Sequence, residues 1–217
     1  MPARGTIAAV AVPVGVGQKV GRRTLRSNVE SQPMQIHLGS GLPPRPGRGN
    51  ISCMLPPLRR LEPQEWQLLR LARLTALKES PDAFLATHAC EMSYDQERWQ
   101  EEFDRGEWFV REHGEGVICM TGVTREYGAP SDVRYLEYVW VAPEYRRDRV
   151  AYDMLSEVLR YLKESGVRTV FLYVLEGNQP ATWLYKRLDF QSTDKKPLLP
   201  DGSGRREEQF SRDLTER

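Results

Sequence analysis

Apolar side chains recur at helical spacing in the first part of the chain that carries a regular pattern. Between Leu61 and Pro81, apolar residues return at intervals close to a helical turn, which is typical of an amphipathic helix. A second, shorter helix is predicted over Ser93–Gly106, with Ser93 and Gln96 forming a capping box at its start. Each helix would bury one apolar face in a core.

The pattern then changes to segments rich in β-branched and aromatic residues, which is typical of strands. Two of them flank the turn His113–Gly116 and predict a hairpin. Helices return at Val150–Gly166, where an apolar stripe ends at a capping glycine, and at Asn178–Leu188. The predicted strands are Glu107–Glu112, Val117–Thr124, Arg134–Val141, Thr169–Val174 and Glu207–Leu214. This order predicts an α/β or α+β sandwich with helices on both faces of one mainly antiparallel sheet.

The first 55 residues differ from the rest in composition. His37–Asn50 holds seven Gly or Pro in 14 residues, which neither a helix nor a central strand tolerates. The segment Thr6–Gly17 resembles a short apolar signal region, but proline and glycine interrupt it. We therefore expect residues 1–55 to form a disordered leader and residues 56–217 to form one folded domain.

Charge and composition narrow the classes of protein. The net charge of the chain is +1, and the leader carries seven cations and one anion, so the remainder is acidic at −5. An acidic domain is not typical of nucleic-acid binding. No apolar run is long enough to span a bilayer. Three scattered cysteines and three scattered histidines give neither a disulfide framework nor a metal-ligand spacing, so a cytoplasmic, metal-free protein is expected.

Several motifs in the second half resemble the acetyl-CoA half of the GNAT superfamily of N-acetyltransferases. They are the strand "LEYVWVAP", the turn "YRRDRVA", the strand "FLYV" and the segment "NQPATWLYKRLDF", in that order. With the first helix, the resemblance covers about residues 57–214. It implies a GNAT-like fold, acetyl-CoA as acyl donor and an amine as acceptor.

The turn before the third predicted helix resembles the pyrophosphate-binding pattern [QR]-x-x-G-x-[GA] of that family. Arg146 takes its first position and Ala151 its last, but Arg149 stands where the family has a glycine. Backbone N–H groups at a helix N-terminus bind phosphate, and glycine lets the ligand approach closely. Arginine removes that clearance but adds a positive charge. The residues expected at the pyrophosphate are Arg146, Arg147, Asp148, Arg149, Val150 and Ala151.

Two further segments are expected to contact the cofactor by the same resemblance. The pantetheine arm would pair with backbone groups of Val139, Trp140 and Val141, much like an added strand, while their side chains pack. Asn178 aligns with an asparagine that opens the following helix in many members. It could cap the helix, hydrogen-bond the cofactor, or do both.

The resemblance also suggests catalytic groups. Tyr185 matches the tyrosine that protonates the departing sulfur, since a phenol stays protonated at neutral pH. By two-residue alternation, Glu137 lies on the same strand face as Val139 and Val141. Its carboxylate could act as the base, bind a cationic substrate or be a charge at the sheet edge. The plausible liners of an acceptor site are Arg70, Arg73, Glu91 and Tyr94. In addition, Asp189 replaces the glycine of the family's "LGF" ending.

Two hypotheses follow for function. The first is an enzyme that transfers an acetyl group from acetyl-CoA to a primary amine of a small molecule or peptide, by direct attack on the thioester. The second is an inactive GNAT-fold binding or sensor module in which Arg149 has abolished cofactor binding. The expected partners are acetyl-CoA and an unidentified amine, with a homodimer left open, and neither nucleic acid nor membrane is expected.

Overall fold

The computed structural model describes residues 55–114, 116–199 and 202–215. The predicted leader, up to residue 54, lies outside the described residues. The strands are β1 (Arg59–Arg60), β2 (Gly106–His113), β3 (Gly116–Thr124), β4 (Val133–Val141), β5 (Thr169–Leu175), β6 (Gln191–Ser192) and β7 (Glu207–Asp213). The α-helices are α1 (Trp66–Glu79), α2 (His88–Met92), α3 (Gln96–Asp104), α4 (Val150–Glu164) and α5 (Gln179–Arg187). Short 3-10 helices at Pro63–Glu65, Pro81–Ala83 and Pro143–Tyr145 join them.

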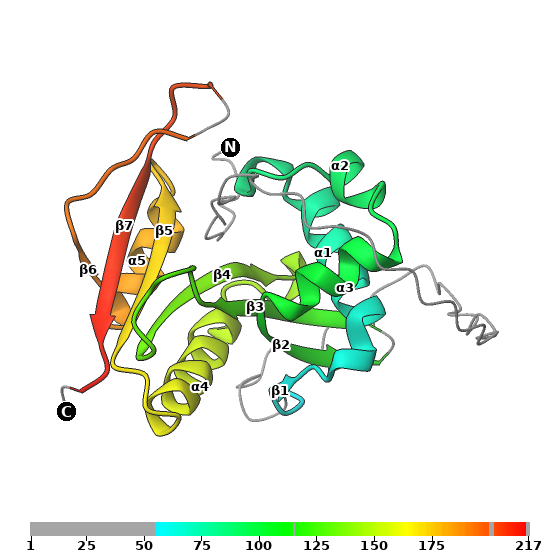
Figure 1. Ribbon diagram of the computed structural model, residues 1–217, viewed down its shortest axis with the longest axis horizontal. Helices are drawn as coiled ribbons and strands as arrows, with labels where there is room; N and C mark the ends of the chain where they lie inside the picture. The colour runs from blue at the N-terminus through cyan, green and yellow to red at the C-terminus, as the bar shows by residue number, and fades with distance from the viewer. Residues whose placement is uncertain (1–54, 115, 200–201, 216–217) are drawn as a thin grey trace.

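The strands form one seven-stranded sheet in the order β1-β2-β3-β4-β5-β7-β6. All neighbouring pairs are antiparallel except β4 and β5, which are parallel. A parallel pair needs a crossover connection, and α4 supplies it. Figure 1 shows α1, α2 and α3 gathered on one side of β2–β4 and α4 on the other. The predicted sandwich is therefore confirmed.

Burial follows the apolar periodicity of the sequence. β3 is buried at every position after Gly116, because helices cover both faces of the sheet at this strand. The apolar stripe of α4 faces the core as predicted, and Gly166 follows its end at φ 83°. The buried residues of α4 are Val150, Ala151, Met154, Leu155, Val158, Leu159 and Leu162. No helix in the described ranges is long and apolar enough to cross a bilayer.

The predicted capping box at Ser93 and Gln96 is wrong. Helix α3 begins two residues later than that box requires, and the Asp95 side chain accepts a hydrogen bond from the Arg98 N–H at 2.9 Å. Ser93 instead closes α2, where its hydroxyl donates to the Cys90 carbonyl at 2.6 Å. The sequence did not predict α2, a helix of five residues, and its presence occupies Ser93 as a C-terminal cap.

A β-bulge in β4 changes the face on which Glu137 lies. Trp140 pairs with Met120 and Glu137 pairs with Gly122, so two residues of β4 lie opposite Thr121 alone. The extra residue interrupts the two-residue alternation. Glu137 therefore shares a face with Trp140 and not with Val141, and the predicted common face of Glu137 and Val141 is wrong.

Packing explains where this bulge occurs. Tyr138 takes a φ of 56° in the bulge, and its ring packs on Trp108 with 5.1 Å between centroids. A Cβ added at Gly122, next to the bulge, would lie 2.8 Å from the Trp108 ring. Glycine at this position therefore lets the indole and the phenol approach the β3 backbone closely.

The parallel pair β4–β5 is short and the two strands then separate. Pairing joins only Val133–Tyr135 to Thr169–Phe171. The rest of β4, residues 136–141, pairs with β3 alone, so its other edge carries backbone groups without a strand partner. This edge is the opening into which an extended ligand can add as a strand.

Candidate active site

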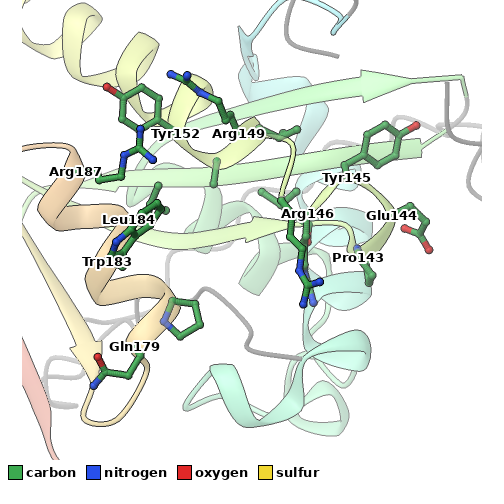
Figure 2. A pocket seen from close by; sticks show the side chains of 15 residues that line it. Pro143, Glu144, Tyr145, Arg146, Arg149, Tyr152, Gln179, Trp183, Leu184 and Arg187 are labelled. Carbon is green, nitrogen blue, oxygen red and sulfur yellow. The ribbon is translucent and has the colours of Figure 1, made fainter. Parts of the chain in front are cut away.

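A cavity of about 1020 Å³ lies where β4 ends, beside the start of α4 and the first turns of α5 (Figure 2). Four elements therefore contribute to its wall: the end of β4, the turn that follows, α4 and α5. The lining residues are Val141, Pro143, Glu144, Tyr145, Arg146, Arg147, Arg149, Val150, Ala151, Tyr152, Gln179, Pro180, Trp183, Leu184 and Arg187. Its size suits a large organic ligand.

The turn that enters α4 has a glycine-like backbone without containing glycine. Arg147 has a φ of 72° and Arg149 a φ of 62° with ψ 5°, both in the left-handed region. Arg149 is the N-cap of α4, and its side chain makes no capping hydrogen bond. The first N–H groups of a helix have no acceptor within the helix. This turn therefore presents N–H donors and the positive end of the helix dipole to the cavity, which is the geometry of an anion site.

The Arg149 guanidinium lies at the cavity rim. It stacks over the Tyr152 ring at 5.0 Å, and Arg187 of α5 approaches the same ring at 5.6 Å (Figure 2). Arg187 also lies 4.7 Å from the Trp183 ring, which is exposed. Cation–π contacts hold both guanidinium groups beside the cavity mouth, where they add positive charge.

Three residues that line the cavity were not predicted from the sequence as site residues: Tyr152, Trp183 and Arg187. Arg187 follows Trp183 by one helical turn, so their proximity could have been found from spacing alone. Their approach to Tyr152 needs the packing of α5 beside α4, which no local pattern gives.

Arg146 lines the cavity, and contacts with other parts of the protein fix its side chain. Its Nε donates to the Val141 carbonyl at 2.8 Å, and its Nη2 pairs with Glu79 at the end of α1. The same Glu79 carboxylate accepts from Trp140 Nε1 at 3.1 Å. Arg146 therefore anchors the turn to the end of β4 and to α1.

The other predicted cofactor residues lie around this cavity in different ways. Val141 lines it, whereas the side chains of Val139 and Trp140 are buried in the core beside the open edge of β4. Asp148 belongs to the turn but is not among the residues that line the cavity. Asn178 caps α5, with Oδ1 accepting from the Ala181 N–H at 3.2 Å. Its neighbours Gln179 and Pro180 line the cavity.

Tyr185 is fully buried with an unsatisfied hydroxyl. Its exposed fraction is 0%, and the hydroxyl has no hydrogen-bond partner in the described part of the chain. Its ring meets Phe190 edge-on at 5.8 Å. Burial raises the pKa of the phenol above its usual value, so the hydroxyl stays protonated at neutral pH. A buried donor without an acceptor is costly, and a ligand atom would satisfy it.

Glu137 is a carboxyl group suited to exchange a proton near neutral pH. Its Oε2 atom is buried and has no hydrogen-bond partner among the described residues. Burial raises the pKa of Glu137 to about 7, while the charge of Arg105 and a hydrogen bond from Thr124 act the other way. This face of β4 is covered by α3, since Trp108, which lies in register with Glu137 across β3, donates its Nε1–H to the Phe103 carbonyl of α3 at 2.8 Å.

Two of the suggested acceptor liners are committed to the core. Arg73 and Glu91 are 4% and 7% exposed and form a bidentate ion pair, with 2.7 Å between Arg73 Nη2 and Glu91 Oε1. The Arg73 guanidinium also lies between the rings of Phe84 and Tyr138, at 4.6 and 4.3 Å. This pair joins α1 to α2, and the expectation that it is free to line an acceptor site is wrong.

Within the described residues, no group of three or more His, Cys, Asp or Glu side chains is arranged to hold a metal ion. The candidate site therefore consists of an anion-binding turn, a cavity, an open strand edge, a buried phenol and a buried carboxyl group.

Comparison with solved structures identifies the fold. The ribosomal-protein-alanine N-acetyltransferase from Brucella melitensis is similar over 72% of this chain and 99% of its own, with 17% identity and a TM-score of 0.57. The ribosomal-protein-S18-alanine N-acetyltransferase from Escherichia coli matches 73% of this chain and 93% of its own, at 19% identity and a TM-score of 0.53. An acetyltransferase of the GNAT family from Staphylococcus aureus matches 73% and 99%, at 14% identity and a TM-score of 0.54.

Sequence comparison gives the family. No curated protein sequence matches this chain significantly. The model of the acetyltransferase (GNAT) family matches residues 73–190, which is more than half of the chain and runs from within α1, through the turn before α4, to just past α5. The predicted resemblance is confirmed, and the chain belongs to the GNAT acetyltransferase family.

Proposed function

We propose that this protein transfers an acetyl group from acetyl-CoA to a primary amine of a small molecule or peptide. The observation that carries the proposal is the turn at Arg149. Its backbone takes a left-handed conformation that glycine adopts without strain, and it opens onto the cavity at the N-terminus of α4.

The donor would occupy the site from the cavity to the strand edge. Backbone N–H groups of the turn and the start of α4, Val150 and Ala151 among them, would bind the pyrophosphate. Arg149 and Arg187 would add charge at the rim, where the nucleotide end is exposed. The pantetheine amides would pair with the unpartnered edge of β4 at Val139–Val141, which brings the thioester toward the inside of the sheet.

The chain's own residues would move two protons during the reaction. The protonated amine carries two protons more than the amide product, and it gives up one of them before its nitrogen forms a bond to the thioester carbonyl carbon. Glu137 would take that proton, because a carboxyl group with a pKa of about 7 accepts protons near neutral pH. The attached nitrogen loses the other proton to solvent as the C–S bond breaks, and Tyr185 would donate its proton to the departing thiolate. The phenol recovers its proton from solvent before the next cycle.

The acceptor class remains broad under this proposal. Two structures with the same fold are named for acetylation of a ribosomal-protein alanine, and another for phosphinothricin. Their identities of 17 to 20% support a shared fold and do not select among these acceptors. Both a peptide amine and a small-molecule amine therefore stay within the proposal.

Calorimetry with acetyl-CoA tests the donor half, and thiol release with a panel of primary amines tests the transfer. We expect saturable binding and thiol release that depends on the amine. Absence of binding at millimolar acetyl-CoA would contradict the proposal and favour the inactive binding module. The Arg187→Ala variant should bind acetyl-CoA more weakly than the wild type, since it loses one rim charge. The Lys195→Ala variant, which loses a charge outside the cavity lining, should not.

A further inference from the structure

Glu207 places a second carboxyl group on the sheet face that carries Glu137. Tyr135 pairs with Phe171 across β4 and β5, and their rings stack at 5.5 Å. Side chains of a strand alternate between its faces, so Glu137 and Tyr173 follow on this same face. On β7, Gln209 pairs with Tyr173 and its Nε2 donates to the Tyr173 hydroxyl at 2.6 Å. Glu207 is two residues before Gln209 and lies on the same face.

Both carboxyl groups are buried, and one oxygen of each accepts no hydrogen bond from the described residues. Glu207 is only 1% exposed, and neither its Oε1 atom nor the Oε2 atom of Glu137 has a hydrogen bond to the part of the chain that the structure describes. The negative charge of Glu137 acts on Glu207 and, together with burial, raises the pKa of Glu207 to about 7. The two groups therefore lie within electrostatic range of each other, across the gap where β4 and β5 have separated.

No cation of the described chain neutralises this pair directly. Arg105 of α3 acts on Glu137 at longer range, but its guanidinium is hydrogen-bonded to Glu102 at 3.0 Å. The other charged groups that face Glu137 are Glu102 and Glu126, and both are acidic. Tyr173 is the titratable group beside Glu207, and its pKa is raised by burial and by the charge of Glu126, so it stays neutral.

Such an arrangement is unfavourable unless a ligand completes it. Buried carboxylates are normally paired with a cation or fully hydrogen-bonded, because the loss of hydration is otherwise uncompensated. Here two carboxyl groups of like charge have free oxygens in the interior, beside the edge of β4 proposed to hold the thioester arm. A primary ammonium group has three donors and one positive charge, which match these oxygens.

We infer that Glu207 and Glu137 together bind the acceptor's ammonium group, and that the acceptor is a primary amine without a carboxylate next to the nitrogen. The inference rests on the proposed acetyl transfer and names its acceptor class. Glu137 takes the proton, and Glu207 is a positioning residue that holds the cation and opposes anions. An α-amino acid would bring its own carboxylate beside two others, which electrostatic complementarity disfavours.

The test compares Glu207→Gln with Glu208→Gln. The first keeps the size of the side chain and removes its charge. The second makes the same change one residue along β7, where the side chain accepts a hydrogen bond from Ser192 on the other face. Thermal unfolding is measured at pH 8 with n-butylammonium chloride or with sodium chloride at equal ionic strength. Kinetics with glycinamide and glycine follow on the same proteins.

We expect n-butylammonium to stabilise the wild type and Glu208→Gln beyond the effect of sodium, and to lose this excess in Glu207→Gln. The KM for glycinamide should rise on the order of tenfold in Glu207→Gln, as for the loss of a hydrogen bond to a charge, with the acetyl-CoA affinity unchanged. The preference for glycinamide over glycine should fall. Equal stabilisation of wild type and Glu207→Gln by n-butylammonium would overturn the inference.

The two proposals fail in different ways. If acetyl-CoA binds to none of the proteins, the proposed function fails, while the n-butylammonium measurement still decides whether the carboxyl pair binds a cation. If acetyl-CoA binds and the amine measurements do not depend on Glu207, the inference alone fails. If Glu207→Gln does not fold, Glu137→Gln replaces it, since it removes charge from the same pair on a different strand. Loss of the n-butylammonium effect in that variant supports the pair, and its persistence contradicts it.

Discussion

Arg149 combines a strained backbone with a useful side chain. Its φ of 62° lies where a non-glycine residue costs about 1–2 kcal/mol. The Arg149→Gly variant should therefore be more stable to urea by about 1 kcal/mol. The same change removes a guanidinium from the cavity rim, so acetyl-CoA should bind more weakly in calorimetry if the charge matters more than clearance. Tighter binding would show that the side chain obstructs the ligand.

Asp194 offers a matched control for that backbone effect. It also has a left-handed φ, of 61°, and it lies on an exposed loop outside the cavity lining. The Asp194→Gly variant should gain stability by a smaller amount, because aspartate tolerates this conformation better than arginine. Its acetyl-CoA affinity should equal that of the wild type.

The hydroxyl of Tyr185 can be tested separately for its effect on stability and on catalysis. Its hydroxyl is buried without a partner, so the Tyr185→Phe variant loses no hydrogen bond in the free protein. Its free energy of unfolding should be unchanged or higher by about 1 kcal/mol, from the removed desolvation cost. If the phenol protonates the leaving thiolate, turnover should fall on the order of a hundredfold, with unchanged acetyl-CoA affinity. An unchanged rate of thiol release would remove Tyr185 from the mechanism.

Elements that are defined by local pattern were predicted well. The stripe of α4, the strand β5 and the N-cap at Asn178 all lie where spacing and capping chemistry put them. The bulge in β4 was not predicted, because it depends on Tyr138 packing against Trp108 and on Gly122 in the next strand. Two-residue alternation holds only for an uninterrupted ladder, and this is why the face of Glu137 was misassigned.

The residues of the candidate site also divide into those that a local pattern predicts and those that depend on the packing of distant segments. The turn from Arg146 to Ala151 is contiguous in the sequence and could be recognised by its position before an amphipathic helix. Glu207 could not be distinguished from Glu208, since both lie in one short polar run. What separates them is the pairing of β5 with β7, which buries Glu207 and leaves Glu208 half-buried on the other face. Nonlocal pairing of this kind carries no local signal.

The start of α5 gives a prediction for an element. Asn178 Oδ1 caps the helix at the Ala181 N–H, so Asn178→Ala should lower the free energy of unfolding by about 1 kcal/mol. Asn178→Ser retains a capping oxygen and should restore most of that stability. If Asn178 serves only as a cap, both variants keep the acetyl-CoA affinity of the wild type, as measured by calorimetry. Weaker binding by the serine variant would show a separate contact with the cofactor.

Three expectations concern the whole molecule. The leader at residues 1–55, the cytoplasmic setting and a homodimer stay predictions. The family assignment rests on a match that runs from within α1 to just past α5, and this stretch includes helices on both faces of the sheet. The N-terminal helices cover the face that carries Glu137, and α4 covers the other face. Under the proposed function, acetyl-CoA and the acceptor amine would therefore enter from opposite faces of the sheet.

The carboxyl pair makes the stability of the whole protein depend on pH. Glu137 and Glu207 have an ordinary pKa of 4.5, and in the folded state both pKa values are raised to about 7. Below pH 4.5 both groups are protonated whether the chain is folded or unfolded, and their contribution to stability is complete. Between pH 4.5 and 7 the unfolded chain releases protons that the folded chain keeps. The free energy of unfolding must therefore fall across this window.

The double variant Glu137→Gln and Glu207→Gln removes both titrations and keeps the side-chain shapes. Relative to this variant, the wild type should lose on the order of 6 kcal/mol between pH 4.5 and pH 8, about 3 kcal/mol for each carboxyl group, where one pKa unit is about 1.4 kcal/mol. The measurement is urea unfolding of both proteins at each pH without ligand. The difference should be constant above pH 8, since both carboxyl groups are then ionised. If the two proteins show parallel stability curves from pH 4.5 to 8, the carboxyl groups are not held in the uncompensated state on which proton transfer and amine binding depend.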